Sequence, residues 1–125
     1  MDYIVLDMEW NQTWPGSPSS KKVLPVTIRG EIIQIGAVRV TEDQQVADEF
    51  QIMIKPKYYR HLNRRVSKLT GIKESRLKEE GVPFAYAMEQ FRQWCGEDIV
   101  FLTWGFDDIG ILRENLQLHG LDIDW

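Results

Sequence analysis

Apolar and polar residues alternate along the first half of the chain in the manner of β-strands. A short apolar run at Tyr3–Leu6 predicts a buried strand whose end, Asp7–Trp10, is polar. The β-branched run Gly30–Val40 predicts a second strand, and Ala47–Lys55 alternates as its antiparallel partner after a turn at Thr41–Gln45. These patterns predict a meander of three antiparallel strands at the start of the domain.

The period of the pattern becomes helical after Pro56. Short helices are predicted at Asn63–Thr70 and Lys73–Glu80, because each amphipathic segment is followed by a glycine. A longer helix is predicted to begin at Pro83 and to end at Gly96, with its apolar residues on one face. The middle of the chain is therefore expected to be helical.

The last part of the chain returns to a strand and then a helix. The apolar segment Asp98–Trp104 predicts a fourth strand, and Asp107 or Asp108 is expected to cap a helix that Gly120 stops. Prolines, a glycine and Ser/Thr residues predict that Asn11–Lys22 is a loop. The order of elements indicates the α/β class, with a mixed sheet and flanking helices.

The composition indicates one domain, residues 1–125. With 43% hydrophobic and 27% charged residues among 125, the chain is not a disordered tail. No apolar run reaches the roughly 18 residues that span a bilayer, and the acidic N-terminus does not resemble a signal peptide. Cys95 is the only cysteine, so no internal disulfide can form. We therefore expect a cytoplasmic protein without a membrane partner.

The distribution of charge is more informative than the net charge of −4. Residues 55–78 carry nine basic residues and one acid, for a local charge of +8, whereas the remainder of the chain carries −12. We call residues 55–78 the basic segment. Aromatic residues are interleaved with its first basic residues, as in proteins that bind single strands. A solvated surface would explain the charge equally well, but the pattern favours a polyanionic partner.

Two groups of acids are placed where strands are expected to end. Asp7 and Glu9 are two residues apart on a strand, so both side chains leave the same face. Asp107 or Asp108 follows the fourth strand, and it would join them if the first and fourth strands were parallel neighbours. An exposed rim and an ordinary helix cap are the alternatives. Clustered carboxylates are the ligands that Mg²⁺ or Mn²⁺ prefers.

Four motifs in order resemble a known family. IVLDMEWN, EIIQIGAV, LTGI and TWGFDDIGIL resemble the DEDD superfamily of 3′–5′ exonucleases, and within it the ERI/KapD-like branch. The resemblance extends from residue 3 to about residue 120. It implies an RNase H-like fold and metal-dependent hydrolysis of phosphodiesters at single-stranded 3′ ends, with RNA favoured over DNA.

The resemblance also implies roles for particular residues. Asp7, Glu9 and Asp108 would be catalytic metal ligands for Mg²⁺ or Mn²⁺, with two ions in a complete site; Asp108 fits the family's Asp-x-x-apolar-Leu pattern better than Asp107 does. Nucleic acid would contact two short segments near the terminal nucleotide and the basic segment. These substrate-binding candidates are Met8, Trp10, Thr70, Gly71, Ile72, Arg60, Arg64, Arg65 and Lys68. Trp10 and Ile72 could equally belong to the core.

The family's third motif, a histidine followed by an aspartate, does not follow Asp108 in these 125 residues. We therefore expect an incomplete domain that lacks the C-terminal part of the fold and is a weak or inactive nuclease. Apolar sheet surface left uncovered in this way predicts a homo-oligomer. The alternative is an exonuclease fold that binds nucleic acid or regulates without hydrolysis. The histidines present, His61 and His119, are poor candidates for the missing base.

Overall fold

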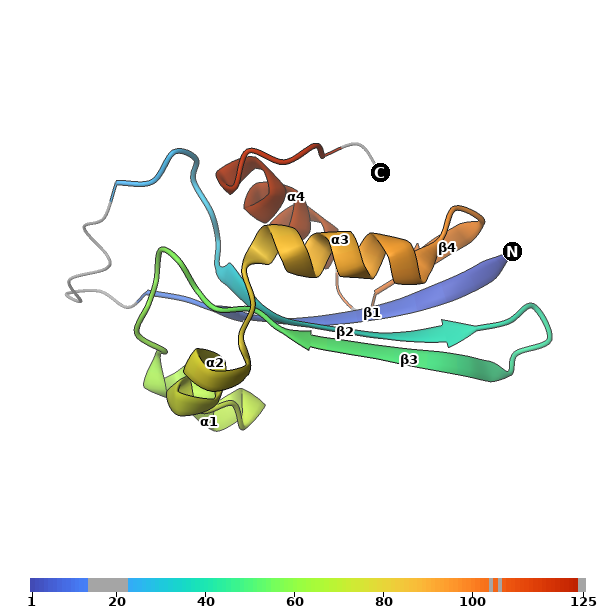
Figure 1. Cartoon of the computed structure of the whole chain (residues 1–125), viewed down its shortest axis with the longest axis horizontal. Helices are drawn as coiled ribbons and strands as arrows, with labels where there is room; N and C mark the ends of the chain where they lie inside the picture. The colour runs from blue at the N-terminus through green and yellow to red at the C-terminus, as the bar shows by residue number, and fades with distance from the viewer. Residues whose placement is uncertain (14–22, 104, 106, 124–125) are drawn as a thin grey trace.

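The computed structural model describes residues 1–13, 23–103, 105 and 107–123. A mixed four-stranded sheet is ordered β3-β2-β1-β4 (Figure 1). Its strands are β1 (Asp2–Asn11), β2 (Glu31–Val40), β3 (Val46–Met53) and β4 (Ile99–Leu102). The first three strands form the expected antiparallel meander, and β4 pairs in parallel with β1. The predicted fold class and the predicted neighbourhood of the first and fourth strands are both confirmed.

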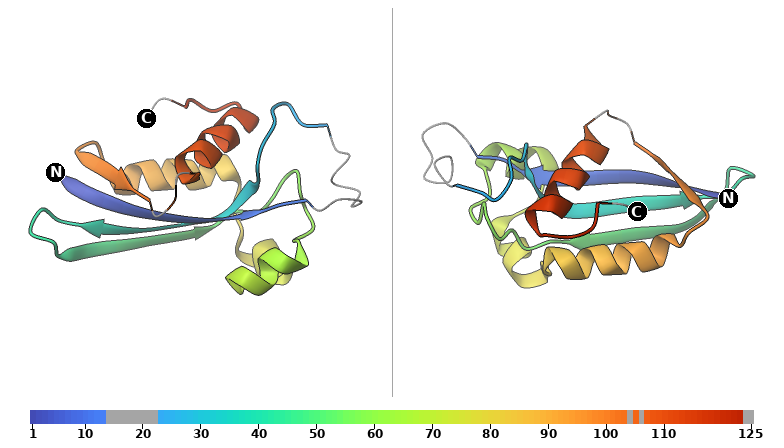
Figure 2. Two further views of the ribbon diagram at one scale, coloured as in Figure 1. Left: turned by 180° about the vertical axis from the view of Figure 1, so that it is seen from behind. Right: turned by 90° about the horizontal axis from the view of Figure 1, so that it is seen from above.

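Helices cover the two faces of the sheet unequally. α3 (Phe84–Cys95) and α4 (Asp108–Leu118) lie on one face, as Figures 1 and 2 show, and α1 (Arg64–Thr70) and α2 (Glu74–Glu80) lie on the other face at one end. The larger core lies under α3 and α4, where Leu6 and Met8 of β1 meet Phe91 and Leu112. A smaller core lies under α1 and α2, around Ile33.

The helix ends lie where the sequence predicts, although Asp107, at the N-cap of α4, makes no side-chain capping hydrogen bond with the described residues. Asn63 caps α1 by accepting a hydrogen bond from the backbone N–H of Arg65, and Gly71 ends that helix in the left-handed conformation, with φ of 76°. Pro83 precedes α3 and Gly96 follows it. At the end of α4, His119 is the cap and Gly120 has a φ of 68°. Local side-chain and backbone preferences thus set these boundaries.

Strand boundaries differ more from the expectation, because pairing rather than local pattern sets them. β1 continues through Asp7 and Glu9 to Asn11, since β2 pairs with it along this whole length, with a bulge between Glu9 and Trp10. β4 is shorter than predicted and ends at Leu102. Most of the predicted loop Asn11–Lys22 lies outside the described residues. Within the described part of the chain, no helix is long and apolar enough to cross a membrane.

Candidate active site

Asp7 and Glu9 project from the middle and the end of β1 onto the face opposite α3 and α4. Their strand neighbours Leu6 and Met8 are buried in the larger core, so the alternation of side chains sends the two acids to the other face. The register pairs Asp7 with Gly36, which adds no side chain there, and Asp7 is exposed. The expectation that both acids share one face is confirmed.

Asp108 joins this pair from the first turn of α4. The pKa of Glu9 is raised by burial and by the charges of Asp7 and Asp108. The pKa of Asp108 is raised by burial and by the charges of Asp7 and Asp107. Carboxylates from β1 and α4 therefore lie close enough to repel one another, and a cation between them would relieve that repulsion.

The donor set suits a hard divalent cation, because it consists of carboxylate oxygens alone. As the side chains are placed, no group of three or more His, Cys, Asp or Glu residues among the described residues is gathered closely enough to hold an ion. The donors thus fit Mg²⁺ or Mn²⁺ in kind.

Asp107 and Asp108 have different surroundings. The Asp107 carboxylate is 3.1 Å from Nη1 of Arg29, and 72% of its side chain is exposed. Arg29 also pairs with Glu114, 2.7 Å away, through Nη2, which ties the start of β2 to α4. Asp107 is therefore engaged on the side of Arg29, whereas the charge of Asp108 acts on Glu9. Of the two aspartates, Asp108 is therefore the one coupled electrostatically to Glu9.

The residues that flank the acids have different environments. The Met8 side chain is 3% exposed and belongs to the core under α3 and α4, so only its backbone is available to a ligand. Trp10 is half-buried, and its indole packs so closely on Gly30 that a β-carbon at Gly30 would collide with it. Trp10 thus packs against the larger core while keeping part of its surface accessible.

The Thr70-Gly71-Ile72 turn closes α1, which packs over β1. The Thr70 hydroxyl donates to the carbonyl of Val66 at 2.8 Å and accepts the N–H of Ile72 at 3.1 Å. Ile72 is buried in the smaller core, so its side chain packs rather than contacts solvent. The turn is a rigid element beside the strand that carries the acids.

The four basic candidates of this region are exposed: Arg60, Arg64, Arg65 and Lys68. Three of them lie on α1, and Arg60 lies in the segment between β3 and α1. The basic segment therefore borders the face of the sheet on which the acids project.

Two buried polar residues that sequence reasoning missed hold the basic segment to the sheet. Glu31, 1% exposed, accepts backbone hydrogen bonds from Lys57 at 2.8 Å and Tyr59 at 2.7 Å, and a further one from Tyr58. Asn11, fully buried, donates to the carbonyls of Tyr59 and His61. The sequence signals that could have identified them are an acid at the start of one apolar strand and an asparagine at the end of another.

The two histidines have other neighbours. His61 is exposed, with Nδ1 3.6 Å from the carboxylate of Glu74. His119 stacks on Phe84, with ring centroids 4.5 Å apart, and burial together with the charge of Lys57 lowers its pKa. Burial thus outweighs the helix dipole, which by itself would favour a charged imidazole at this helix end.

Comparison with known proteins agrees with this geometry. The sequence model of the exonuclease family RNase_T matches residues 4–122. No curated protein sequence matches the chain. The nuclease domain of 3′hExo, a DEDDh family member, bound to rAMP has a TM-score of 0.79 at 22% identity, over 98% of this chain and 61% of that one.

Two further structures share the fold. Cell-death related nuclease 4 (CRN-4) has a TM-score of 0.77 at 20% identity, over 96% of this chain and 40% of that chain. Exonuclease I has a TM-score of 0.71 at 15% identity, over 98% of this chain and 25% of that chain. This chain thus spans less than two thirds of the length of each of these structures. By the extent of the family match, the chain belongs to the RNase_T exonuclease family.

Proposed function

We propose that this domain hydrolyses phosphodiester bonds at the 3′ ends of single-stranded nucleic acid, with RNA favoured over DNA, and that it uses Mg²⁺ or Mn²⁺. The observation that carries the proposal is the approach of Asp7, Glu9 and Asp108 from β1 and α4, close enough that their charges add to burial in raising the pKa of Glu9 and Asp108. Membership of the exonuclease family and the similarity to a structure that holds a ribonucleotide support the nature of the substrate.

Each group of residues has a proposed role. Asp7, Glu9 and Asp108 would hold the metal; when bound, divalent ions activate water and stabilise the leaving oxygen. Trp10 and the backbone of Met8 and Thr70–Ile72 would position the terminal nucleotide. The exposed cations of the basic segment would bind phosphates, with the strongest contribution from Arg60, Arg64, Arg65 and Lys68.

The rate of hydrolysis by these 125 residues is expected to be low. A general base contributes about 10²–10⁴-fold to such reactions. His61 is paired with Glu74 and His119 is stacked on Phe84, so neither histidine of the chain accompanies the acids. We therefore expect the binding of metal and of single-stranded nucleic acid to be easier to detect than turnover.

Thermal unfolding with and without Mn²⁺ tests the metal site. A metal that binds only the folded chain raises Tm as its concentration passes Kd. We expect Mn²⁺ to raise the Tm of the wild-type chain, and Asp7→Asn and Asp108→Asn to abolish the increase. Asp107→Asn is the matched control and should retain it. An unchanged Tm in millimolar Mn²⁺ would refute the site. If the Tm increase were lost in Asp107→Asn but kept in Asp108→Asn, Asp107 would be the ligand.

Single-turnover cleavage of a single-stranded RNA labelled at its 5′ end tests the reaction itself. Shortening from the 3′ end, dependent on Mn²⁺ and abolished by Asp108→Asn, is the expected result. The same assay with DNA of equal sequence should proceed more slowly. If the chain binds metal and RNA but does not shorten the RNA, the result would contradict hydrolysis and indicate a nucleic-acid-binding domain of the same fold.

Compartment and assembly are proposed on separate grounds. Cys95 is the only cysteine and is buried, which suits a reducing compartment such as the cytoplasm. On the sheet face away from α3 and α4, Tyr3, Val100 and Leu102 lie together through the pairing of β1 with β4, and all of them are exposed. Such an apolar strip supports self-association of the domain.

A further inference from the structure

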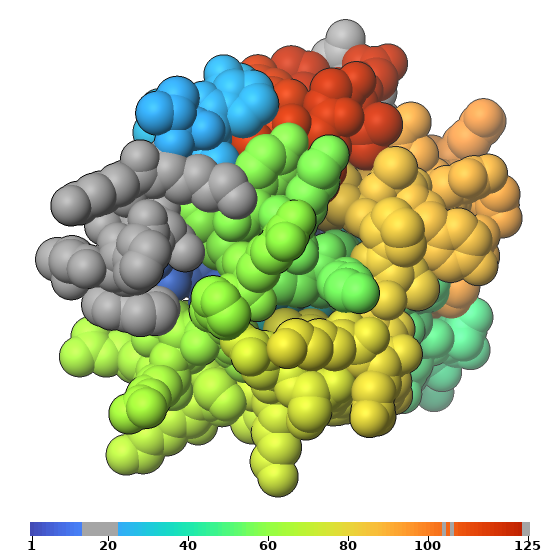
Figure 3. Space-filling model, turned by 60° about the vertical axis from the view of Figure 1, so that its left-hand side comes forward, coloured from blue at the N-terminus to red at the C-terminus, as the bar shows by residue number. Residues whose placement is uncertain are grey.

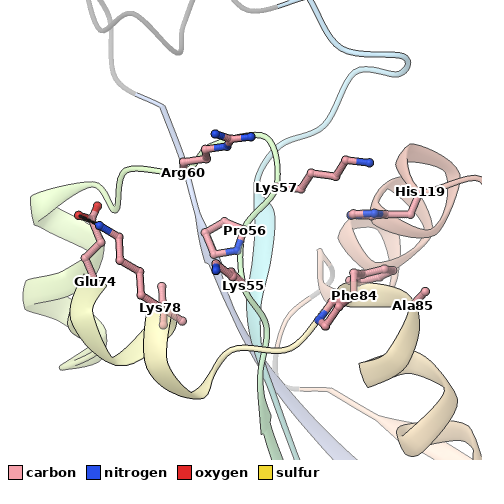
Figure 4. Close-up of a pocket in the computed structure, with 11 residues that line it drawn as sticks. Lys55, Pro56, Lys57, Arg60, Glu74, Lys78, Phe84, Ala85 and His119 are labelled. Atoms are coloured by element: carbon pink, nitrogen blue, oxygen red, sulfur yellow. Dashed lines mark ion pairs between the residues drawn. The ribbon is translucent and has the colours of Figure 1, made fainter.

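A cavity of about 730 Å³ lies at one end of the molecule, away from the clustered acids. It is lined by the segment that follows β3, by α2, by the start of α3 and by the end of α4 (Figures 3 and 4). The residues that matter to the argument are Lys55, Lys57, Arg60, Lys78, Phe84 and His119. None of the proposed metal ligands lines it.

The lining of the cavity is positively charged. Lys78 pairs with Glu74, the one acid of the lining, at 3.8 Å, and Glu74 also accepts the backbone N–H of Leu62 at 2.7 Å. Lys55, Lys57 and Arg60 make no ion pair with any described residue, although the Lys57 ammonium lies 5.6 Å from the centre of the Tyr58 ring. Several unpaired cations around one opening attract a ligand with more than one negative charge, such as a phosphate group.

The backbone that carries these cations is held in place before any ligand arrives. Glu31 accepts the consecutive N–H groups of Lys57, Tyr58 and Tyr59 from inside the fold. Asn11 fixes the next turn of the segment through the carbonyls of Tyr59 and His61. Little backbone entropy therefore remains to be lost when an anion binds, which favours affinity.

One wall of the cavity is aromatic. His119 stacks on Phe84 with an angle of 15° between the rings, and Tyr58 approaches His119 edge-on at 5.7 Å. Figure 4 shows Lys57 extending toward His119 across the mouth of the cavity. A flat ring beside unpaired cations matches a ligand that carries both a base and a phosphate.

We infer that this cavity is a second nucleotide site, which binds one nucleotide unit of the strand whose 3′ end lies at the carboxylates. The inference rests on the proposed function for the position of that 3′ end. The residues from Asp108 to His119 span α4, so the two sites are about 16 Å apart at 1.5 Å per residue. A strand that occupies both sites must therefore extend several nucleotides beyond its 3′-terminal nucleotide.

Binding measured in EDTA tests the cavity without involving the metal. The probes are AMP and single-stranded oligoribonucleotides of two, four, six and eight nucleotides. We expect affinity to increase sharply with length across this series, and Lys57→Gln and His119→Ala to remove about tenfold of that increase. Lys57→Gln should also reduce the log–log salt slope for the longest probe by about 0.7, the value for one lost phosphate contact with a single strand.

Arg113→Gln is the matched control, because Arg113 is exposed on α4 and outside the cavity lining, and it removes the same charge. The control should leave length dependence and salt slope unchanged. If AMP binds tightly, Lys57→Gln abolishes that binding and affinity does not depend on probe length, the cavity binds a free nucleotide. That result would contradict its role in binding the strand. Equal affinities and slopes in wild type, Lys57→Gln and His119→Ala would overturn the inference.

These experiments test the nucleotide site in the cavity and the metal site independently. The Tm increase with Mn²⁺ reports only the carboxylates, and Lys57→Gln should leave it unchanged. If Mn²⁺ does not bind while Lys57→Gln still weakens binding of the long probes, the result supports the nucleotide site in the cavity and contradicts the proposed hydrolysis. If Mn²⁺ binds and probe length has no effect on affinity in any variant, only the proposed nucleotide site in the cavity is contradicted.

Discussion

Clustered like charges at Glu9 have a cost that a single substitution can measure. Burial, followed by the charges of Asp7 and Asp108, raises the pKa of Glu9, so the ionised side chain destabilises the metal-free fold. Glu9→Gln removes that charge without a change of shape. At pH 7.5 in EDTA we expect the variant to be more stable than wild type by about 0.5 kcal/mol, the scale of a partly exposed charge pair.

The same substitution should have the opposite effect once Mn²⁺ is present, because a ligand is lost. Urea unfolding of wild type and Glu9→Gln, in EDTA and in Mn²⁺, compares the two conditions directly. Glu49→Gln, which neutralises an exposed acid on β3, is the control and should change neither free energy of unfolding appreciably. Destabilisation of Glu9→Gln in EDTA would contradict the repulsion that underlies the proposed site.

His119 provides a test of burial through pH. Burial and the neighbouring Lys57 lower its pKa from the ordinary value of 6.5, so the folded chain resists protonation. Above pH 6.5 the imidazole is neutral in both the folded and unfolded chains and has no effect. As the pH falls below that value, the unfolded chain takes up the proton first, and the free energy of unfolding decreases.

His119→Phe should preserve the stack on Phe84 and abolish this decrease. The free energy of unfolding of variant and wild type is compared by urea titration between pH 7.5 and pH 5. The difference should change in favour of the variant as the pH falls. A constant difference over that range would show that His119 titrates normally.

At the scale of elements, one buried amide helps to hold α4 over β2. The Asn115 side chain accepts the N–H of Ile32 at 3.0 Å and donates to the carbonyl of Gly30 at 2.9 Å. Asn115→Ala leaves both buried groups unpaired. Because each such group costs about 1–3 kcal/mol, we expect the fold to lose about 2–4 kcal/mol.

Asn115→Ala should also reduce the Tm increase that Mn²⁺ produces, because α4 carries Asp108. Gln117→Ala, at an exposed position of the same helix, is the control and should stay within about 0.5 kcal/mol of wild type. Thermal unfolding in EDTA and in Mn²⁺ gives both quantities. A loss below 1 kcal/mol for Asn115→Ala would mean that α4 is held chiefly by its apolar face.

At the scale of the whole molecule, the face away from α3 and α4 combines the acids with an apolar strip. Tyr3 and Val100 are each 38% exposed and Leu102 is 46% exposed. Sedimentation velocity should detect self-association that increases with concentration, and Leu102→Lys should reduce it. Val46→Lys, at another exposed apolar position, is the control and should not. A monomer at every concentration would contradict the expected assembly.

The sequence by itself determined the class of fold, the helix boundaries and the type of chemistry. Asn63, Pro83, Gly71 and Gly96 act through their own conformational preferences, so local pattern was enough to place the ends of α1 and α3. The alternation of Leu6, Asp7, Met8 and Glu9 was enough to send both acids to one face.

Only the tertiary structure decided which polar residues act together. The end of β1, the different surroundings of Asp107 and Asp108, and the anchoring of the basic segment by Glu31 and Asn11 depend on partners 20 or more residues away. The cavity likewise joins Lys57 to His119, which are far apart in the sequence. Pairing, burial and electrostatic coupling act through space, and a local pattern cannot contain them.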